Sequence, residues 1–87
     1  MAYKVVFSYE FDKEFSKLDH YTQTIIIKWI EKHIENCENP RDFGKPLTNN
    51  LKGLWRYRIG DYRLLCEIHD NELIIFALSI GHRKEVY

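Results

Sequence analysis

The stretch that decides the fold runs from Leu54 to Ile80 and reads LWRYRIGDYRLLCEIHDNELIIFALSI. Apolar and polar residues alternate through its first two runs, and a period of two is typical of β-strands. The pattern is interrupted at Gly60 and Asp61, and again at residues 69–71. We therefore predict three antiparallel strands over residues 54–59, 62–68 and 72–80, joined by tight hairpin loops.

The first hairpin loop predicts which side chains share a face of the sheet. Gly60 at the first loop position suits a type II′ turn. That turn sets the register, with Ile59 opposite Tyr62, Arg58 opposite Arg63 and Arg56 opposite Leu65. One face is then apolar and expected to pack on helices, and it consists of Trp55, Tyr57, Ile59, Tyr62, Leu64, Cys66 and Ile68. The other face carries Arg56, Arg58 and Arg63.

The last predicted strand is apolar on both faces. Strict alternation assigns Leu73, Ile75 and Ala77 to one face and Ile74, Phe76, Leu78 and Ile80 to the other. A strand of this kind is typical of the centre of a sheet, or of a surface that a partner covers.

The first half of the chain predicts one strand and two helices. YKVVF, residues 3–7, reads as a short strand, and residues 8–18 place Phe11 and Phe15 at helical spacing behind a capping residue, Ser8. Residues 19–37 repeat the helical pattern before a segment rich in Pro and Gly. The prediction is a single α+β domain over residues 1–87, of order β-α-α-β-β-β, with a helical hairpin packed on one face of an antiparallel sheet.

Composition limits the classes of function. The chain has 87 residues and a formal net charge of zero, and its two cysteines lie outside any metal-ligand spacing, so no metal site and no cofactor are predicted. No apolar run approaches the ~18 residues of a membrane span, which predicts a cytoplasmic protein without a membrane partner. Residues 41–63 are nevertheless cationic, with six basic residues against two acidic ones and a net charge of +4.

The three arginines on one face require an explanation. Like charges directly opposed on antiparallel strands destabilise a sheet, so Arg58 opposite Arg63 is unfavourable by itself. Glu67 on the same face is one source of neutralisation, and simple solvation is another. A row of guanidinium groups is also well suited to the bidentate capture of phosphate oxygens. The closing segment GHRKEVY, residues 81–87, is either a polar tail or an addition of His82, Arg83 and Tyr87 to the rim of this face.

Residues 44–68, GKPLTNNLKGLWRYRIGDYRLLCEI, followed by residues 78–87, LSIGHRKEVY, resemble the RelE toxins of the RelE/ParE toxin–antitoxin superfamily. The resemblance implies the RelE-like fold and a toxin of a type II toxin–antitoxin system. It further implies an mRNA interferase, a ribosome-dependent endoribonuclease that inhibits translation by cutting mRNA in the A site through metal-free attack of a 2′-hydroxyl. The implied partners are the ribosome, mRNA and a cognate antitoxin, RelB-like or other, that also forms a DNA-binding repressor complex, all in the cytoplasm of a bacterium or archaeon.

The resemblance also assigns roles to individual residues. The catalytic set is Arg56, Arg58, Arg63, Arg83, Tyr87 and, as a candidate base, His82. Independently of the resemblance, we expect Arg41, Lys45 and Lys52 of the basic stretch, together with Lys84, to contact RNA or the ribosome. Because arginine holds its proton too tightly to act as a base, Arg56 and Arg58 receive an electrostatic role, and proton abstraction is left to Tyr87 or His82.

Two other functions remain open from the sequence. One is a ParE-like gyrase poison, which acts by binding a topoisomerase without cutting RNA. The other is an inactive toxin retained as half of a repressor complex. Because all three share one fold, the arginine set and the closing segment are the features that favour the nuclease.

Overall fold

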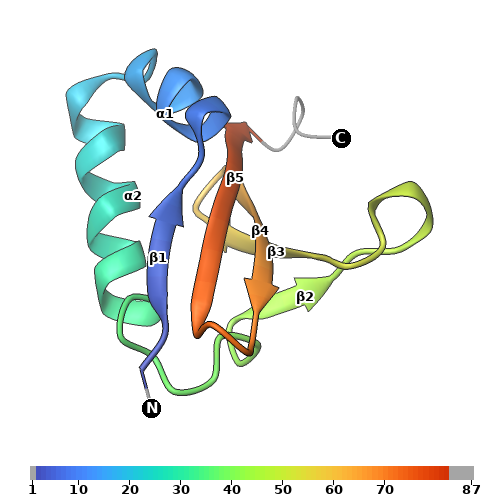
Figure 1. The fold of residues 1–87 in the computed structure, drawn as a ribbon. Coiled ribbons are helices and arrows are strands. Elements are labelled where there is room, and N and C mark those ends of the chain that lie inside the picture. Colours follow the sequence, from blue (N-terminus) through green and yellow to red (C-terminus); the bar gives the residue numbers. More distant parts are fainter. Residues whose placement is uncertain (1, 83–87) are drawn as a thin grey trace.

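Two helices pack on one face of a five-stranded sheet in this chain, whose computed structural model describes residues 2–82 (Figure 1). The strands are β1 (Lys4–Phe7), β2 (Gly44–Pro46), β3 (Leu54–Ile59), β4 (Tyr62–His69) and β5 (Ile74–His82). The helices are α1 (Tyr9–Ser16) and α2 (His20–His33), and a short 3-10 helix, η1 (Asn49–Leu51), lies between β2 and β3. The α+β class and the helical hairpin on one face are confirmed.

The sheet is mixed, where an antiparallel one was predicted. Its strand order is β1-β5-β4-β3-β2, and β1 runs parallel to β5 while the other neighbouring strands are antiparallel. The periodicity of β1 identifies a strand but carries no information about the direction of its partner. Strand β2 was not predicted, because its three residues, GKP, have no alternating pattern.

Both helices begin at the predicted positions, each with a capping side chain. The Ser8 hydroxyl accepts a hydrogen bond from the Phe11 backbone N–H at 3.0 Å, and the Asp19 carboxylate accepts one from the Thr22 N–H at 3.2 Å. Helix α2 ends at His33, four residues before the end of the predicted pattern. The chain turns at Asn36, which has a φ of +64°, a conformation that asparagine tolerates better than most residues.

The predicted register of the β3–β4 hairpin is confirmed in all three of its pairs. Gly60 has a φ of +60°, as a turn of this kind requires of its first loop residue. The apolar face of the hairpin meets Phe11, Ile26 and Ile30 from the helices, and all three are at most 2% exposed. The other face of the hairpin is not covered by either helix (Figure 1).

The predicted assignment of side chains to the two faces of the last strand was wrong at its C-terminal end. Leu65 pairs with Ser79 and Cys66 pairs with Ala77, so Leu78 is an extra residue in a β-bulge. The bulge moves Ile80 onto the same face as Ala77, opposite Leu64, where it is 2% exposed. Strict alternation cannot reveal this, because one inserted residue exchanges the faces of every residue after it.

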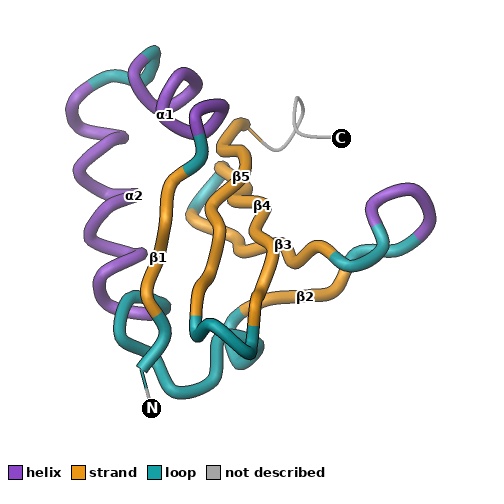
Figure 2. Tube along the Cα trace, in the orientation of Figure 1, coloured by secondary structure: helices purple, strands orange, loops and turns teal. Residues whose placement is uncertain are grey.

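Two of the connections between neighbouring strands are longer than a two-residue loop. The β4–β5 connection spans residues 70–73 and ends at Leu73, with a φ of +56°, so β5 begins two residues later than predicted. The β2–β3 connection carries η1 and projects from the body of the molecule (Figure 2). Within residues 2–82, neither helix is long and apolar enough to cross a membrane.

Candidate functional site

The sheet face without helices carries four basic side chains side by side. Lys45 lies opposite Arg56 in the pairing of β2 with β3, and Arg58 lies opposite Arg63 in the pairing of β3 with β4. Because alternate residues of a strand share a face, Arg56 and Arg58 project on the same side. We call the surface formed by Lys45, Arg56, Arg58 and Arg63 the arginine face.

The sequence left open that Glu67 neutralises the arginines on this face, but in the structure Glu67 has a different partner. Glu67 Oε1 lies 2.6 Å from Nε2 of His69, and this contact, rather than an arginine, holds the carboxylate. The hydrogen bond that the imidazole donates to the Glu67 carboxylate raises the pKa of His69 above its ordinary value. Within residues 2–82, no carboxylate oxygen lies within 4.0 Å of the side-chain nitrogens of Arg56 or Arg58.

The guanidinium group of Arg56 is charged, and one of its nitrogens is buried. Its Nε is buried and has no hydrogen-bond partner within the described residues, although the side chain as a whole is only half-buried. A buried donor without a partner costs free energy, roughly 1–3 kcal/mol for an ordinary group. A phosphate oxygen at the arginine face is the type of acceptor that offsets this cost.

Arg41 is held away from the arginine face. Its guanidinium donates two hydrogen bonds to Asp70, at 3.0 and 2.9 Å, and lies 5.5 Å from the centre of the Trp55 ring. Trp55 belongs to the helix-covered side of the sheet, since it pairs with the buried Cys66. Arg41, together with a hydrogen bond from Tyr3, lowers the pKa of Asp70 to about 2. This arrangement gives Arg41 a structural partner.

His82 also lies on the helix-covered side. It pairs with Tyr62, and the two rings meet edge to face with their centres 5.7 Å apart. The next residue along β4, Arg63, lies on the opposite face and pairs with Gly81. The structure therefore brings Arg56, Arg58, Arg63 and Lys45 together but does not place the His82 ring among them.

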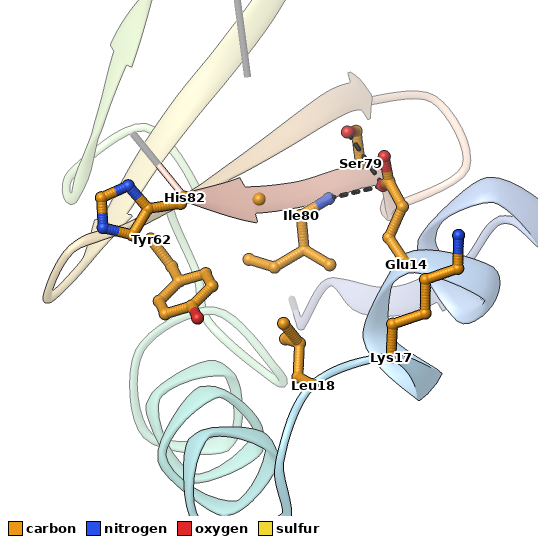
Figure 3. Close-up of a pocket in the computed structure, with 8 residues that line it drawn as sticks. Glu14, Lys17, Leu18, Tyr62, Ser79, Ile80 and His82 are labelled. Carbon is orange, nitrogen blue, oxygen red and sulfur yellow. Dashed lines mark hydrogen bonds between the residues drawn. The ribbon is translucent and has the colours of Figure 1, made fainter. Parts of the chain in front are cut away.

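A cavity of about 570 Å³ lies beside His82, where α1 meets the ends of β4 and β5 (Figure 3). Its lining includes Glu14, Lys17, Leu18, Tyr62, Ile80 and His82. Glu14 was not singled out from the sequence. Its position on a short helix carries no signal for this role, because its contacts are with β5, more than sixty residues away.

The remaining predicted residues lie elsewhere. Lys52 is exposed in the projecting β2–β3 connection, directly after η1. Arg83, Lys84 and Tyr87 lie outside the described residues. Within residues 2–82, no group of three or more His, Cys, Asp or Glu side chains is placed to hold a metal ion.

Comparisons with known proteins agree on one group of toxins. A family model described as the ParE toxin of the type II toxin–antitoxin system parDE matches residues 5–87. Toxin RelG of Mycobacterium tuberculosis is 29% identical over 87 residues, covering 100% of this chain and 98% of that protein. Toxin RelE of the same organism is 41% identical over 49 residues, covering 56% of this chain and 50% of that protein.

Solved structures share the whole fold. The RelBE2 toxin–antitoxin complex from Mycobacterium tuberculosis contains a chain that superposes with a TM-score of 0.85 at 27% identity, covering 98% of this chain and 95% of that one. The intact E. coli RelBE toxin–antitoxin complex gives a TM-score of 0.72 at 22% identity over 93% of this chain and 96% of that one, which supports the fold alone.

Proposed function

The chain belongs to the ParE toxin family of type II toxin–antitoxin systems, within the RelE/ParE superfamily, and we propose that this toxin is a ribosome-dependent endoribonuclease that cuts mRNA in the A site. The observation that carries the proposal is the arginine face. It presents four cations on a sheet face that no helix covers, and within residues 2–82 two of them, Arg56 and Arg58, have no carboxylate partner.

The charge of this face suits the chemistry of RNA cleavage. In the proposed reaction the 2′-oxygen attacks the adjacent phosphorus, the bond from phosphorus to the 5′-oxygen breaks, and a 2′,3′-cyclic phosphate remains. Negative charge grows on the phosphate oxygens in the transition state. Fixed guanidinium groups stabilise that charge without reorganising, and one such donor is commonly worth about 10²-fold or more in rate.

The roles within the face follow from the chemistry of its side chains. Arg58 and Arg63, directly opposed, hold the phosphate, while Arg56 and Lys45 extend the positive surface along the RNA backbone. None of the three arginines is a base at neutral pH. We assign proton abstraction to Tyr87 in preference to His82, because the His82 ring belongs to the opposite side of the sheet. We assign to Arg83 a hydrogen bond to the leaving 5′-oxygen. Lys52 and Lys84 are assigned to contact the ribosome.

The partner in the resting state is proposed to be an antitoxin. The similar M. tuberculosis and E. coli chains were solved in RelBE toxin–antitoxin complexes. A bound antitoxin suits the second face of β5, where Ile74, Phe76 and Leu78 are only half-buried in the isolated chain.

A gyrase poison is the second candidate function, because the family model that matches the chain is named for ParE. Such a toxin acts through protein contacts and has no need of phosphate ligands on its sheet. The arginine face therefore favours the nuclease, and a gyrase supercoiling assay separates the two.

The test is primer extension on an mRNA under translation in a purified bacterial system, with naked RNA as a control. We expect the wild-type protein to cut only translated mRNA. Arg58→Ala and Arg63→Ala are expected to lower the cutting rate by about 10²-fold. Lys32→Ala, an exposed change on α2, is the matched control and is expected to cut normally. Intact mRNA with the wild-type protein, together with inhibited supercoiling, would overturn the proposal in favour of the gyrase poison.

A further inference from the structure

The cavity at the end of β5 contains a carboxylate that the fold holds in place. Glu14 Oε1 accepts one hydrogen bond from the Ser79 hydroxyl and another from the Ile80 backbone N–H, both at 3.0 Å (Figure 3). Within the described part of the chain, no donor hydrogen-bonds to the second oxygen, Oε2. The group is therefore an oriented acceptor with one oxygen available to a ligand.

The topology explains why a carboxylate is needed there. Pairing of β1 with β5 ends at Ala77, so within residues 2–82 the edge of β5 beyond that residue has no neighbouring strand. Backbone groups at such an edge need other partners. The Ser8 hydroxyl donates to the Leu78 carbonyl at 2.9 Å, and Glu14 receives the N–H of Ile80. The Ser79 hydroxyl and the Ile80 N–H hold Oε1 in place, and they thereby also orient the second oxygen, Oε2.

The walls of the cavity suit a flat aromatic ligand. Leu18 supplies apolar surface, and Tyr62 and His82 supply two rings that meet edge to face. A volume of about 570 Å³ lies within the range of about 300–1,000 Å³ that is usual for small-molecule sites. A nucleobase has apolar faces and a polar edge, and aromatic side chains bind such bases by stacking.

The cavity also adjoins the arginine face. Gly81 lines the cavity and pairs directly with Arg63 across β4 and β5. Gly81 has no side chain to separate the two surfaces. A nucleotide whose phosphate contacts Arg63 can therefore direct its base over the end of the strand toward Tyr62.

We propose that this cavity binds a nucleobase that carries an exocyclic amino group, with Glu14 Oε2 as its acceptor, an inference that rests on the proposed RNA function. A carboxylate oxygen accepts but does not donate, and it pairs with the amino group of cytosine in known recognition. Uracil places a carbonyl oxygen at the same position, and two acceptors repel one another. Glu14 thereby determines specificity, while the arginine face binds any phosphate.

The test uses Glu14→Gln, which changes one atom of the acceptor. The Ser79 hydroxyl and the Ile80 N–H both donate, so the amide oxygen of glutamine must take the place of Oε1. Its NH₂ group then replaces Oε2 and turns an acceptor into a donor. The preference is expected to move from cytosine to uracil, a reversal that simple loss of structure cannot produce.

Binding is measured by NMR titration of the purified full chain with cytidine 3′-monophosphate and uridine 3′-monophosphate, following the backbone amides of Ser79, Ile80 and Gly81. In the wild-type protein we expect cytidine to bind about tenfold more tightly, which corresponds to about 1.4 kcal/mol. Glu14→Gln is expected to favour uridine, and Lys13→Gln, an exposed change on the same helix, is expected to retain the cytidine preference.

Equal binding of the two nucleotides by the wild-type protein, absence of saturable shifts at millimolar concentrations, or an unchanged cytidine preference in Glu14→Gln would each overturn the inference. The titration needs no ribosome and no cleavage. Failure of the nuclease proposal in the primer-extension assay is therefore a separate result from failure of the base site.

Discussion

Replacing Arg58 with glutamine tests whether the arginine face is retained at a cost to stability. Arg58 and Arg63 occupy directly opposed positions on β3 and β4. Like charges at such positions destabilise the pair by roughly 0.2–1 kcal/mol. Glutamine keeps an unbranched stem and a polar end but removes the charge, so we expect the free energy of unfolding to rise by about that amount. For a domain of this size, the gain corresponds to an increase in Tm of roughly 1–8 °C.

Urea denaturation at low and high salt measures the effect and identifies its cause. The Debye length falls from about 10 Å at 0.1 M salt to about 3 Å at 1 M, so repulsion between two guanidinium groups is screened at high salt. We expect Arg58→Gln to exceed the wild-type stability at low salt and to approach it at 1 M NaCl. Arg58→Lys retains the charge and is the matched control, with stability close to that of the wild type at both salt concentrations.

The reasoning is refuted if Arg58→Gln gives no gain at low salt, or if an equal gain persists at 1 M NaCl, since either result removes charge repulsion as the cause. The same variant is expected to lose about 10²-fold in mRNA cleavage in the translation assay. Stability and activity then change in opposite directions, as expected of a residue that serves a ligand rather than the fold.

Two further predictions concern the fold. Ile80→Ala is expected to lower the free energy of unfolding by about 2–5 kcal/mol because the β-bulge buries this side chain, whereas Leu78→Ala at the half-buried bulge residue costs less, and urea denaturation of both variants checks the difference. Arg41 lowers the pKa of Asp70 to about 2, so the stability that this contact contributes is present above about pH 4 and is lost as the pH falls toward 2. Asp70→Asn is therefore expected to weaken the dependence of Tm on pH between pH 4 and 2, and unchanged pH dependence would contradict the assignment.

Much of the sheet could be predicted because its information is local. Gly60 specifies the turn, the turn specifies the register, and the register places Arg58 opposite Arg63 without reference to the rest of the chain. Ser8 likewise marks the start of α1 through a bond to a backbone group three residues away. These two features depend on neighbours in sequence, and both were predicted correctly.

Features that depend on contacts between distant segments were not predicted. The β-bulge at Leu78 is a property of the pairing between β4 and β5, and no single-strand pattern records it. Arg41 was predicted to bind RNA because it lies in a basic stretch, whereas its partner, Asp70, is twenty-nine residues away. Lys45, by contrast, reaches the arginine face only because β2 adds to the edge of β3.

The unequal lengths of β1 and β5 connect the fold to the proposed chemistry. Because β1 is only four residues long, the last part of β5 has an open edge within the described residues, and a side chain from α1 satisfies it. Replacing Glu14 with alanine would remove this support and the proposed base contact together, so a loss of binding would not separate them. Glutamine preserves the support and reverses only the polarity of the exposed atom, which makes the direction of the specificity change, rather than its size, the decisive observation.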